Sequence, residues 1–223
     1  MQSALDECAA NTQVRAVYIT GAGKAFCAGE DLAEVVDPQG PGMNRILYEH
    51  FNPIVAKICY LEKPVIAAVE GPAAGAGFSL ALACDLIVAA QDSVFVMAYS
   101  NVALSPDGGG TWSLMQAMPR ATALQLMLTG DRVDAQRLLS LGVISSVCGQ
   151  GEALGEALAL AEKLNARAPN ALASIKELAN DAMTGSLHSQ LGAERDHFVR
   201  NLHHANAGEG IAAFLEKRPP QYR

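Results

Sequence analysis

Residues 64–90 read Pro64-Val65-Ile66-Ala67-Ala68-Val69-Glu70-Gly71-Pro72-Ala73-Ala74-Gly75-Ala76-Gly77-Phe78-Ser79-Leu80-Ala81-Leu82-Ala83-Cys84-Asp85-Leu86-Ile87-Val88-Ala89-Ala90. The run 64–69 is apolar, contains β-branched residues and stops at glycine, which predicts a strand. The small apolar run 77–83 predicts a buried helix, and 85–90 predicts the next strand. Glycine loop, helix and strand in quick succession predict a spiral or layered α/β core.

The rest of the chain divides into a strand-rich first part and a helix-rich second part. A strand is predicted at 14–20, a loop at 37–43 and an amphipathic helix at 44–61. Further helices are predicted at 111–118, 120–128, 134–141, 151–167, 170–183, 186–203 and 209–216. We therefore expect an α/β core over residues 1–150 and a helical C-terminal subdomain over 151–223, divided near 149–151.

Composition and charge restrict the classes of partner. The 223 residues are 50% apolar and carry a formal charge of −7, which disfavours broad binding to nucleic acid or to an anionic membrane. The five cysteines show neither disulfide nor metal-ligand spacing. The N-terminus has no basic segment followed by an apolar one, as a secretion signal would. We expect a cytoplasmic protein with no membrane span and no bound metal.

Two glycine-bearing segments, 25–32 and 71–77, and the stretch just before the first of them raise the possibility of a nucleotide-binding site. The spacing of their glycines does not support it. Gly21-Ala22-Gly23-Lys24 lacks the P-loop spacing, and 71–77 lacks GxGxxG. Small residues also let backbone N–H groups approach a ligand, and a helix that opens after Gly75 would add its positive end. The segments thus favour an oxyanion hole, although glycines that merely permit tight packing remain an alternative.

The segment Ser105-Pro106-Asp107-Gly108-Gly109-Gly110-Thr111-Trp112 places one carboxylate among residues that free the backbone. Asp107 is either an aspartate of an ordinary turn after Pro106 or the acid/base group of a site. Together with the two amide-presenting segments, it indicates a charge-stabilising site with a single proton carrier.

The chain resembles the crotonase superfamily, the enoyl-CoA hydratase/isomerase family. Four ordered motifs carry this resemblance, and a characteristic ending extends it over nearly the whole chain. The segments are 23–32, 71–77 with 81–85, 105–112, 128–132 and 209–218. The resemblance implies a spiral of ββα units with a helical C-terminal subdomain that serves in oligomerisation, as a homotrimer or hexamer.

The resemblance also implies an acyl-CoA thioester substrate and no separate cofactor. The thioester carbonyl would be held by the backbone N–H groups of Glu30 and Ala76, each worth about 3 kcal/mol toward an enolate. The positions that match the family's CoA-binding segments are Lys24, Ala25, Phe26, Ala28, Asp31 and Leu32, with Phe214 and Lys217 on the C-terminal helix. Simple solvated charge is the alternative for the two lysines.

Departures from the family pattern bear on the reaction. Hydratases of this family use two glutamates, and those positions hold Ser79 and Tyr99 here, which we expect to line the acyl pocket together with Trp112. Asp107 matches the acid of isomerase-type members, which predicts a double-bond shift or ring rearrangement. The alternatives are hydratase-like activity, aryl-CoA dehalogenase or hydrolase activity, and a non-catalytic acyl-CoA-binding protein. Relative to the family, an N-terminal hairpin is expected to be absent, because the chain opens almost directly in the helix before Val14.

Overall fold

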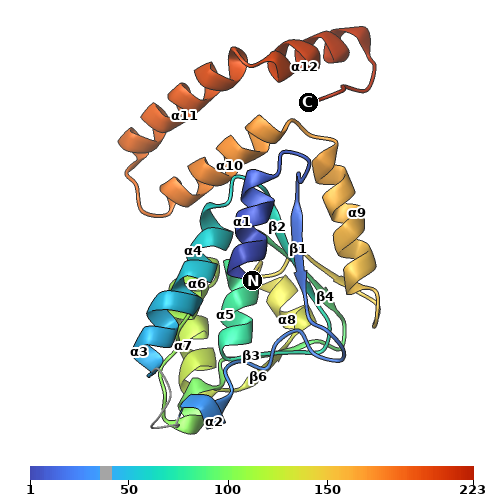
Figure 1. Ribbon diagram of the computed structural model, residues 1–223. Helices are drawn as coiled ribbons and strands as arrows, with labels where there is room; N and C mark the ends of the chain where they lie inside the picture. The colour runs from blue at the N-terminus through green and yellow to red at the C-terminus, as the bar shows by residue number, and fades with distance from the viewer. Residues whose placement is uncertain (36–41) are drawn as a thin grey trace.

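Two small sheets form the centre of the fold in the computed structural model, which describes residues 1–35 and 42–223 (Figure 1). The larger sheet has the order β1-β2-β4-β7 and is parallel throughout; its strands are Val17–Thr20, Val65–Val69, Leu86–Ala90 and Ser146–Cys148. The smaller sheet joins β3 (Pro72–Ala74), β5 (Val94–Val96) and β6 (Arg132–Asp134). The loop predicted at 37–43 lies outside the described residues except for Gly42 and Met43.

Successive strands leave one sheet and enter the other, which produces the predicted spiral. β2 and β4 lie in the larger sheet, and β3 and β5, which follow them directly, pair in parallel in the smaller one. Gly71 makes the first of these turns with φ +60, and a Cβ there would meet the carbonyl oxygen of Lys24 at 2.2 Å. Only glycine permits that conformation together with that close approach. The α/β architecture predicted from residues 64–90 is confirmed.

Helices cover both faces of the larger sheet. Val65, Ala67 and Val69 face the main core, which includes α4 (Asn52–Tyr60) and α5 (Ala76–Ala83). Ile66 and Ala68, which alternate with them, face α9 (Ala153–Asn165). Strands covered on both faces are continuous apolar runs, as the 64–69 segment is.

The N-terminal helices and the smaller sheet enclose the other side of the core. α1 (Gln2–Ala10) packs against α4, and α5 holds the smaller sheet through Phe78, whose ring centre lies 5.0 Å from that of Phe95. The helix predicted at 44–61 is observed as α3 (Met43–Ile46), a π-helical turn η1 (Leu47–Phe51) and α4. The π turn comes directly before Pro53, which has no N–H for the helical ladder.

The remaining helices follow the predicted order. They are α6 (Gly110–Ala117), α7 (Arg120–Thr129), α8 (Ala135–Ser140), α10 (Pro169–Ala182), α11 (Leu187–Leu202) and α12 (Ala205–Glu216), with a 3-10 turn η2 at Ala98–Val102 and the short α2 at Leu32–Val35. In Figure 1, α11 and α12 lie beyond α10, away from the sheets. The expected division at 149–151 falls just before α9, yet α9 packs on the larger sheet, so the C-terminal helices that lie outside the sheet layers are α10 to α12.

An ion pair fastens α10 to the core. Nζ of Lys176 lies 2.7 Å from Oδ2 of Asp85 and 2.8 Å from the carbonyl oxygen of Ile58. Oδ2 of Asp85 also accepts the backbone N–H of Val65 at 2.7 Å. Burial raises the pKa of Asp85, and the Lys176 ammonium acts against that rise. Within residues 1–35 and 42–223, no helix has the length and apolar character needed to cross a membrane.

Candidate active site

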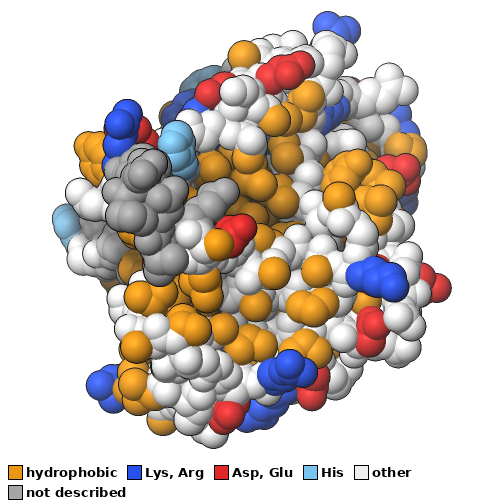
Figure 2. Space-filling view, turned by 60° about the horizontal axis from the view of Figure 1, so that its bottom comes forward, with side chains coloured by type: hydrophobic (Ala, Val, Ile, Leu, Met, Phe, Trp, Pro, Cys, Tyr) orange, Lys and Arg blue, Asp and Glu red, His pale blue; other side chains and the backbone are white. Residues whose placement is uncertain are grey.

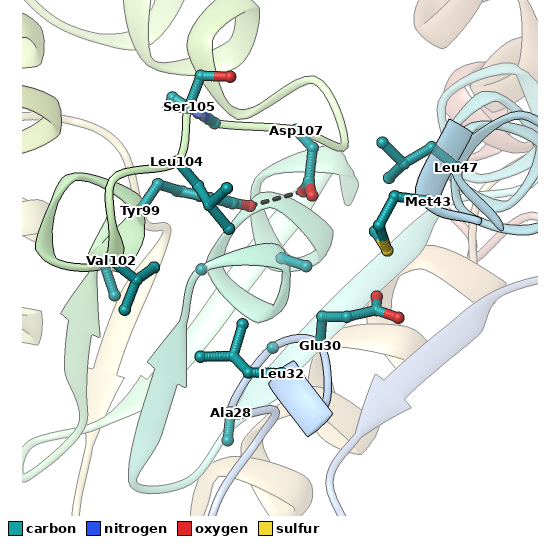
Figure 3. Close-up of a pocket in the computed structure, with 15 residues that line it drawn as sticks. Ala28, Glu30, Leu32, Met43, Leu47, Tyr99, Val102, Leu104, Ser105 and Asp107 are labelled. Atoms are coloured by element: carbon teal, nitrogen blue, oxygen red, sulfur yellow. Dashed lines mark hydrogen bonds between the residues drawn. The ribbon is translucent and has the colours of Figure 1, made fainter. Parts of the chain in front are cut away.

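A cavity of about 350 Å³ opens between the loop before α2, the α3–η1 segment, the N-terminus of α5, and η2 with the loop that follows it (Figure 3). It brings together residues from all three segments singled out in the sequence. The lining residues are Ala28, Gly29, Glu30, Leu32, Met43, Leu47, Gly75, Ala76, Ala98, Tyr99, Val102, Leu104, Ser105, Pro106 and Asp107. Figure 2 shows a hollow with an apolar lining near the middle of the view.

The two amide-presenting segments lie side by side. Cys27 and Ala73 form a parallel β-bridge, and the N–H of Ala74 donates to the carbonyl oxygen of Cys27 at 2.9 Å. A Cβ on Gly29 would lie 3.6 Å from the backbone nitrogen of Ala76. Glu30 follows Gly29 directly, so the backbones of Glu30 and Ala76 meet at one wall of the cavity.

The N-terminus of α5 forms the base of that wall. Gly75 precedes the helix with φ 52 and ψ −124, a conformation that favours glycine, and its N–H donates to the carbonyl oxygen of Val96 at 2.9 Å. Ala76 is the first residue of the helix, so its N–H has no helical partner one turn earlier. The positive end of the α5 dipole therefore lies where a thioester oxygen could be held.

Asp107 lies across the cavity from this wall and is half-buried. Its Oδ1 accepts a hydrogen bond of 2.6 Å from the hydroxyl of Tyr99. Oη of Tyr99 is in turn 3.4 Å from Oγ of Ser79, which is fully buried. Burial raises the pKa of the Tyr99 hydroxyl, and the hydrogen bond to Asp107 raises it further. Tyr99 is therefore a neutral hydrogen-bond donor over the ordinary pH range.

The three glycines after Asp107 let the loop lie tightly on the core. Gly108 and Gly109 have φ of +55 and +78, in the left-handed region. A Cβ on Gly110 would lie 2.4 Å from Oγ of Ser79, and one on Gly108 would lie 3.2 Å from Cβ of Ser79. The small side chain at position 79 thus supports the loop that carries Asp107.

Apolar side chains form the remaining walls. Figure 3 shows Met43 and Leu47 on one side, with Leu32, Val102 and Leu104 around the rest. Leu32, Val102 and Leu104 are each about half exposed. Sequence reasoning did not identify Met43, Leu47, Val102 or Leu104, because the only signal was an apolar residue within a helix or a loop.

The carboxylate of Glu30 also lies at the cavity, in addition to the backbone of that residue. In Figure 3 it extends toward Met43, apart from the Asp107 and Tyr99 pair. A second carboxyl group is therefore present, and it was not assigned a role from the sequence.

The residues expected at the CoA site do not all lie at the cavity. Ala28 and Leu32 line the cavity. The carboxylate of Asp31 accepts the N–H of Ala33 at 2.9 Å and so caps α2. Lys24 is exposed and Ala25 half-buried on the loop before them, whereas the Phe26 side chain is buried in the main core and does not face a ligand.

Two of the expected acyl-pocket residues lie elsewhere. Ser79 is behind Tyr99, where it supports the pocket without lining it. Trp112 lies on α6 and lines a second cavity of about 460 Å³ between α6 and α10, which Lys176 and Asp85 also line. Trp112 is the third residue of α6, and it is 47% exposed and lines this second cavity instead of the Asp107 cavity, so the expectation that it lines the acyl pocket is corrected.

Phe214 and Lys217 lie on the far side of the molecule from the cavity. Phe214 lies in the last turn of α12 and is 82% exposed, and Lys217 caps the end of this helix with φ 55. Other apolar side chains are exposed on α11 and α12, namely Leu187, Leu191, Phe198, Val199, Leu202, Ile211 and Leu215. Within one chain, the structure does not bring Phe214 and Lys217 to the Asp107 cavity (Figure 1).

Known proteins share both the sequence and the fold. A 1,2-epoxyphenylacetyl-CoA isomerase of Escherichia coli strain K12 is 40% identical over 229 residues, which cover all of this chain and 87% of the relative. A probable enoyl-CoA hydratase of Rhodobacter capsulatus is 36% identical, with 96% of this chain and 82% of the relative covered. The crystal structure of an enoyl-CoA hydratase from Polaromonas sp. JS666 superposes with a TM-score of 0.93 at 55% identity, over all of this chain and 87% of that chain.

The Enoyl-CoA hydratase/isomerase family profile matches residues 1–223. The relatives include proteins named for both isomerase and hydratase activity, so the match indicates the shared thioester chemistry and not one reaction. The site geometry and the comparisons agree, and the chain belongs to the enoyl-CoA hydratase/isomerase family, with the crotonase fold.

Proposed function

We propose that this protein is an acyl-CoA isomerase that shifts a double bond, or rearranges a ring acyl group, with Asp107 as the proton carrier. The observation that carries this proposal is the carboxylate of Asp107, fixed by Tyr99 and placed across the cavity from the backbones of Glu30 and Ala76. A carboxylate that faces an oxyanion hole is the minimal machinery for moving a proton along a stabilised enolate.

The proposed reaction moves one proton within the substrate, so no atom is gained or lost. Asp107 removes the C2 proton of a 3-enoyl thioester, and the electron pair of that C–H bond passes into a dienolate. The N–H groups of Glu30 and Ala76 stabilise the charge that develops on the thioester oxygen. The proton on Asp107 then passes to C4, which leaves the double bond between C2 and C3. No water, redox partner or separate cofactor takes part, and CoA enters only as part of the substrate.

Two features favour this reaction over hydration. Tyr99 is held neutral, and its hydroxyl already donates to Asp107. Ser79, at the other position where hydratases have a glutamate, is buried beneath it. A hydratase needs one group to activate water and another to deliver a proton, and a neutral phenol and a buried serine are poor bases near neutral pH.

Hydration is the second candidate, and the carboxylate of Glu30 favours it. This group lines the same cavity as Asp107 and would supply the second acid. The relatives named as hydratases agree with this alternative. A non-catalytic acyl-CoA-binding protein is the third, and a turnover assay beside a binding measurement distinguishes it.

The walls support an apolar, uncharged acyl group. Leu32, Met43 and Leu47 face Val102 and Leu104, and none of the described lining residues is Lys, Arg or His. A negatively charged acyl group would lose water here without gaining an opposite charge. The ring substrate in the name of the Escherichia coli relative fits the same description.

The position of α12 supports a CoA site shared between copies of the chain. We propose that Phe214 and Lys217 contact CoA bound at a neighbouring copy, within a homotrimer or hexamer, because the fold places them away from their own cavity. Lys24, exposed on the loop four residues before Ala28, is proposed to meet the CoA phosphates.

The direct test compares two rates on matched substrates. The protein is assayed with 3-hexenoyl-CoA for formation of the 2-enoyl product, and with 2-hexenoyl-CoA, of the same chain length, for loss of the enoyl absorbance. We expect isomerisation to be faster than hydration by at least about tenfold, which is a difference of one decade in kcat/KM. Hydration that equals or exceeds isomerisation would contradict the proposal, and binding without either reaction would favour the non-catalytic alternative.

A further inference from the structure

Tyr99 contacts both parts of the site, the backbone that precedes Ala76 and the carboxylate of Asp107. Tyr99 is 7% exposed. A Cβ built on Gly75 would lie 3.9 Å from Cζ of Tyr99, so the ring passes beside the backbone that precedes Ala76. The hydroxyl carried by that same carbon donates to Oδ1 of Asp107 at 2.6 Å. The tip of one rigid side chain therefore lies beside the oxyanion-hole wall and is hydrogen-bonded to the proton carrier.

We propose that Tyr99 is a positioning residue that holds the Asp107 carboxylate in one orientation, with Oδ1 bound to the phenol and Oδ2 as the oxygen that carries the proton between C2 and C4. This inference rests on the proposed function and deepens it, since it names the group that sets the path of the proton.

The need for such a residue follows from the aspartate side chain. The terminal torsion of an aspartate has a broad, roughly two-fold preference, so a carboxylate on a glycine-rich loop can turn either oxygen toward a substrate. A hydrogen bond to a charged group, made by a buried donor, removes that freedom. Figure 3 shows the bond from Tyr99 reaching Asp107 along one side of the cavity.

Ser79 fixes the phenol in turn. Oγ of Ser79 lies 3.4 Å from Oη of Tyr99, and Ser79 is 1% exposed. Gly110 lies against the same Oγ, since a Cβ there would approach it to 2.4 Å. The serine therefore contacts both the phenol and the loop that carries Asp107, which makes the chain from Ser79 through Tyr99 to Asp107 one connected support.

The reaction makes this role measurable. After Asp107 takes the C2 proton, it can pass this proton to C4, which completes isomerisation. Alternatively, the proton exchanges with solvent, and Asp107 returns a solvent proton to C2. A carboxylate held in place favours transfer to C4. A loosely held carboxylate keeps the proton for longer before that transfer, so more of the proton exchanges with solvent. The ratio of C2 exchange to isomerisation thus reports on the orientation of the carboxylate, separately from substrate binding.

The experiment uses the full chain with 3-hexenoyl-CoA in D2O. It follows product formation and deuterium at C2 of the recovered substrate, for the wild type, Tyr99→Phe, Ser79→Ala and the control Tyr60→Phe. Tyr60 is 76% exposed on α4. For Tyr99→Phe we expect kcat to fall about 10- to 100-fold while KM changes less than about threefold. We also expect the exchange ratio to rise severalfold.

Ser79→Ala should raise the ratio in the same direction but less, and it carries the test if Tyr99→Phe fails to fold. Tyr60→Phe should match the wild type. An unchanged ratio in both Tyr99→Phe and Ser79→Ala would overturn the inference, even if kcat fell. Asp107→Asn, assayed in parallel, tests the proposed function separately. Retained isomerisation in that variant overturns the proposed function, whereas an inactive Asp107→Asn with an unchanged ratio in both Tyr99→Phe and Ser79→Ala overturns only the role of Tyr99.

Discussion

Oη of Tyr99 lies 2.6 Å from Oδ1 of Asp107, so the one aspartate of the Ser105 to Trp112 segment is part of a buried hydrogen-bond chain. In the sequence, Asp107 could equally have been a turn residue after Pro106. The loop does make a turn, since the N–H of Gly110 donates to the carbonyl oxygen of Asp107 at 3.0 Å. The backbone of Asp107 forms the turn, while its side chain reaches the cavity.

The neutral state of Tyr99 predicts how stability depends on pH. Because the pKa of Tyr99 is raised in the folded chain, its contribution is complete below the ordinary tyrosine pKa of about 10 and is lost as pH rises toward the folded value. Urea unfolding of the wild type and Tyr99→Phe from pH 8 to 11 should show a difference in the free energy of unfolding that is constant at first and decreases above about pH 10. A difference that already decreases below about pH 9 would contradict the raised pKa.

The contact of Gly110 with Ser79 predicts a steric effect. Gly110→Ala would place a methyl group against the buried Oγ of Ser79, which has no room to move away. We expect a loss of about 1–3 kcal/mol in the free energy of unfolding, together with lower kcat, because the Asp107 loop must shift. The matched control is Gly155→Ala in α9, where no atom lies within 4 Å. It should be neutral or stabilise by about 0.5–1 kcal/mol, and a similar loss in both variants would contradict the steric account.

The ion pair between Lys176 and Asp85 predicts a large effect from one removed partner. Lys176→Met leaves the Asp85 carboxylate with the Val65 N–H but without its cation, and should lower the free energy of unfolding by about 3 kcal/mol. Lys163→Met, at an exposed position on α9, should change it by less than about 0.5 kcal/mol. Denaturant unfolding measures both, and equal effects would show that charge alone, and not its burial, determines the result.

The exposed apolar side chains of α11 and α12 predict self-association. Sedimentation should show a trimer or hexamer, and Phe214→Ser should shift it toward smaller species and raise KM for acyl-CoA, because Phe214 is 82% exposed in one chain. Tyr60→Ser, an equally exposed aromatic on α4, is the control and should leave both unchanged. A wild-type monomer with an unaltered KM in Phe214→Ser would contradict a shared CoA site.

The sequence predicted those parts of the fold that depend on local pattern. The strand at 64–69 and the helix at 77–83 agree closely with β2 and α5, since a buried apolar run between glycines has few alternatives. The strands β3, β5, β6 and β7 were not predicted, because each has three residues and is held by pairing with distant segments. Propensity carries little information over so short a run.

The site residues that belong to a sequence motif could be predicted. Those whose orientation depends on packing could be predicted less well. Glu30, Ala76 and Asp107 come from three separated segments and line one cavity, which Tyr99 lines as well. The position of Trp112 could not be predicted, because the direction of a helical side chain depends on where the helix begins. Likewise, nothing in the sequence indicated that Tyr99 would donate to Asp107, which depends on the turn between them.

The central claim is that the Asp107 carboxylate carries the proton, and replacement by its neutral isostere tests it most directly. Asp107→Asn keeps the size of the side chain and should lower kcat for 3-hexenoyl-CoA isomerisation by at least about 100-fold, the usual contribution of a general acid/base. Calorimetry with a saturated acyl-CoA should show nearly unchanged affinity, and thermal unfolding should confirm a folded chain. Isomerisation at the wild-type rate in folded Asp107→Asn would contradict the account.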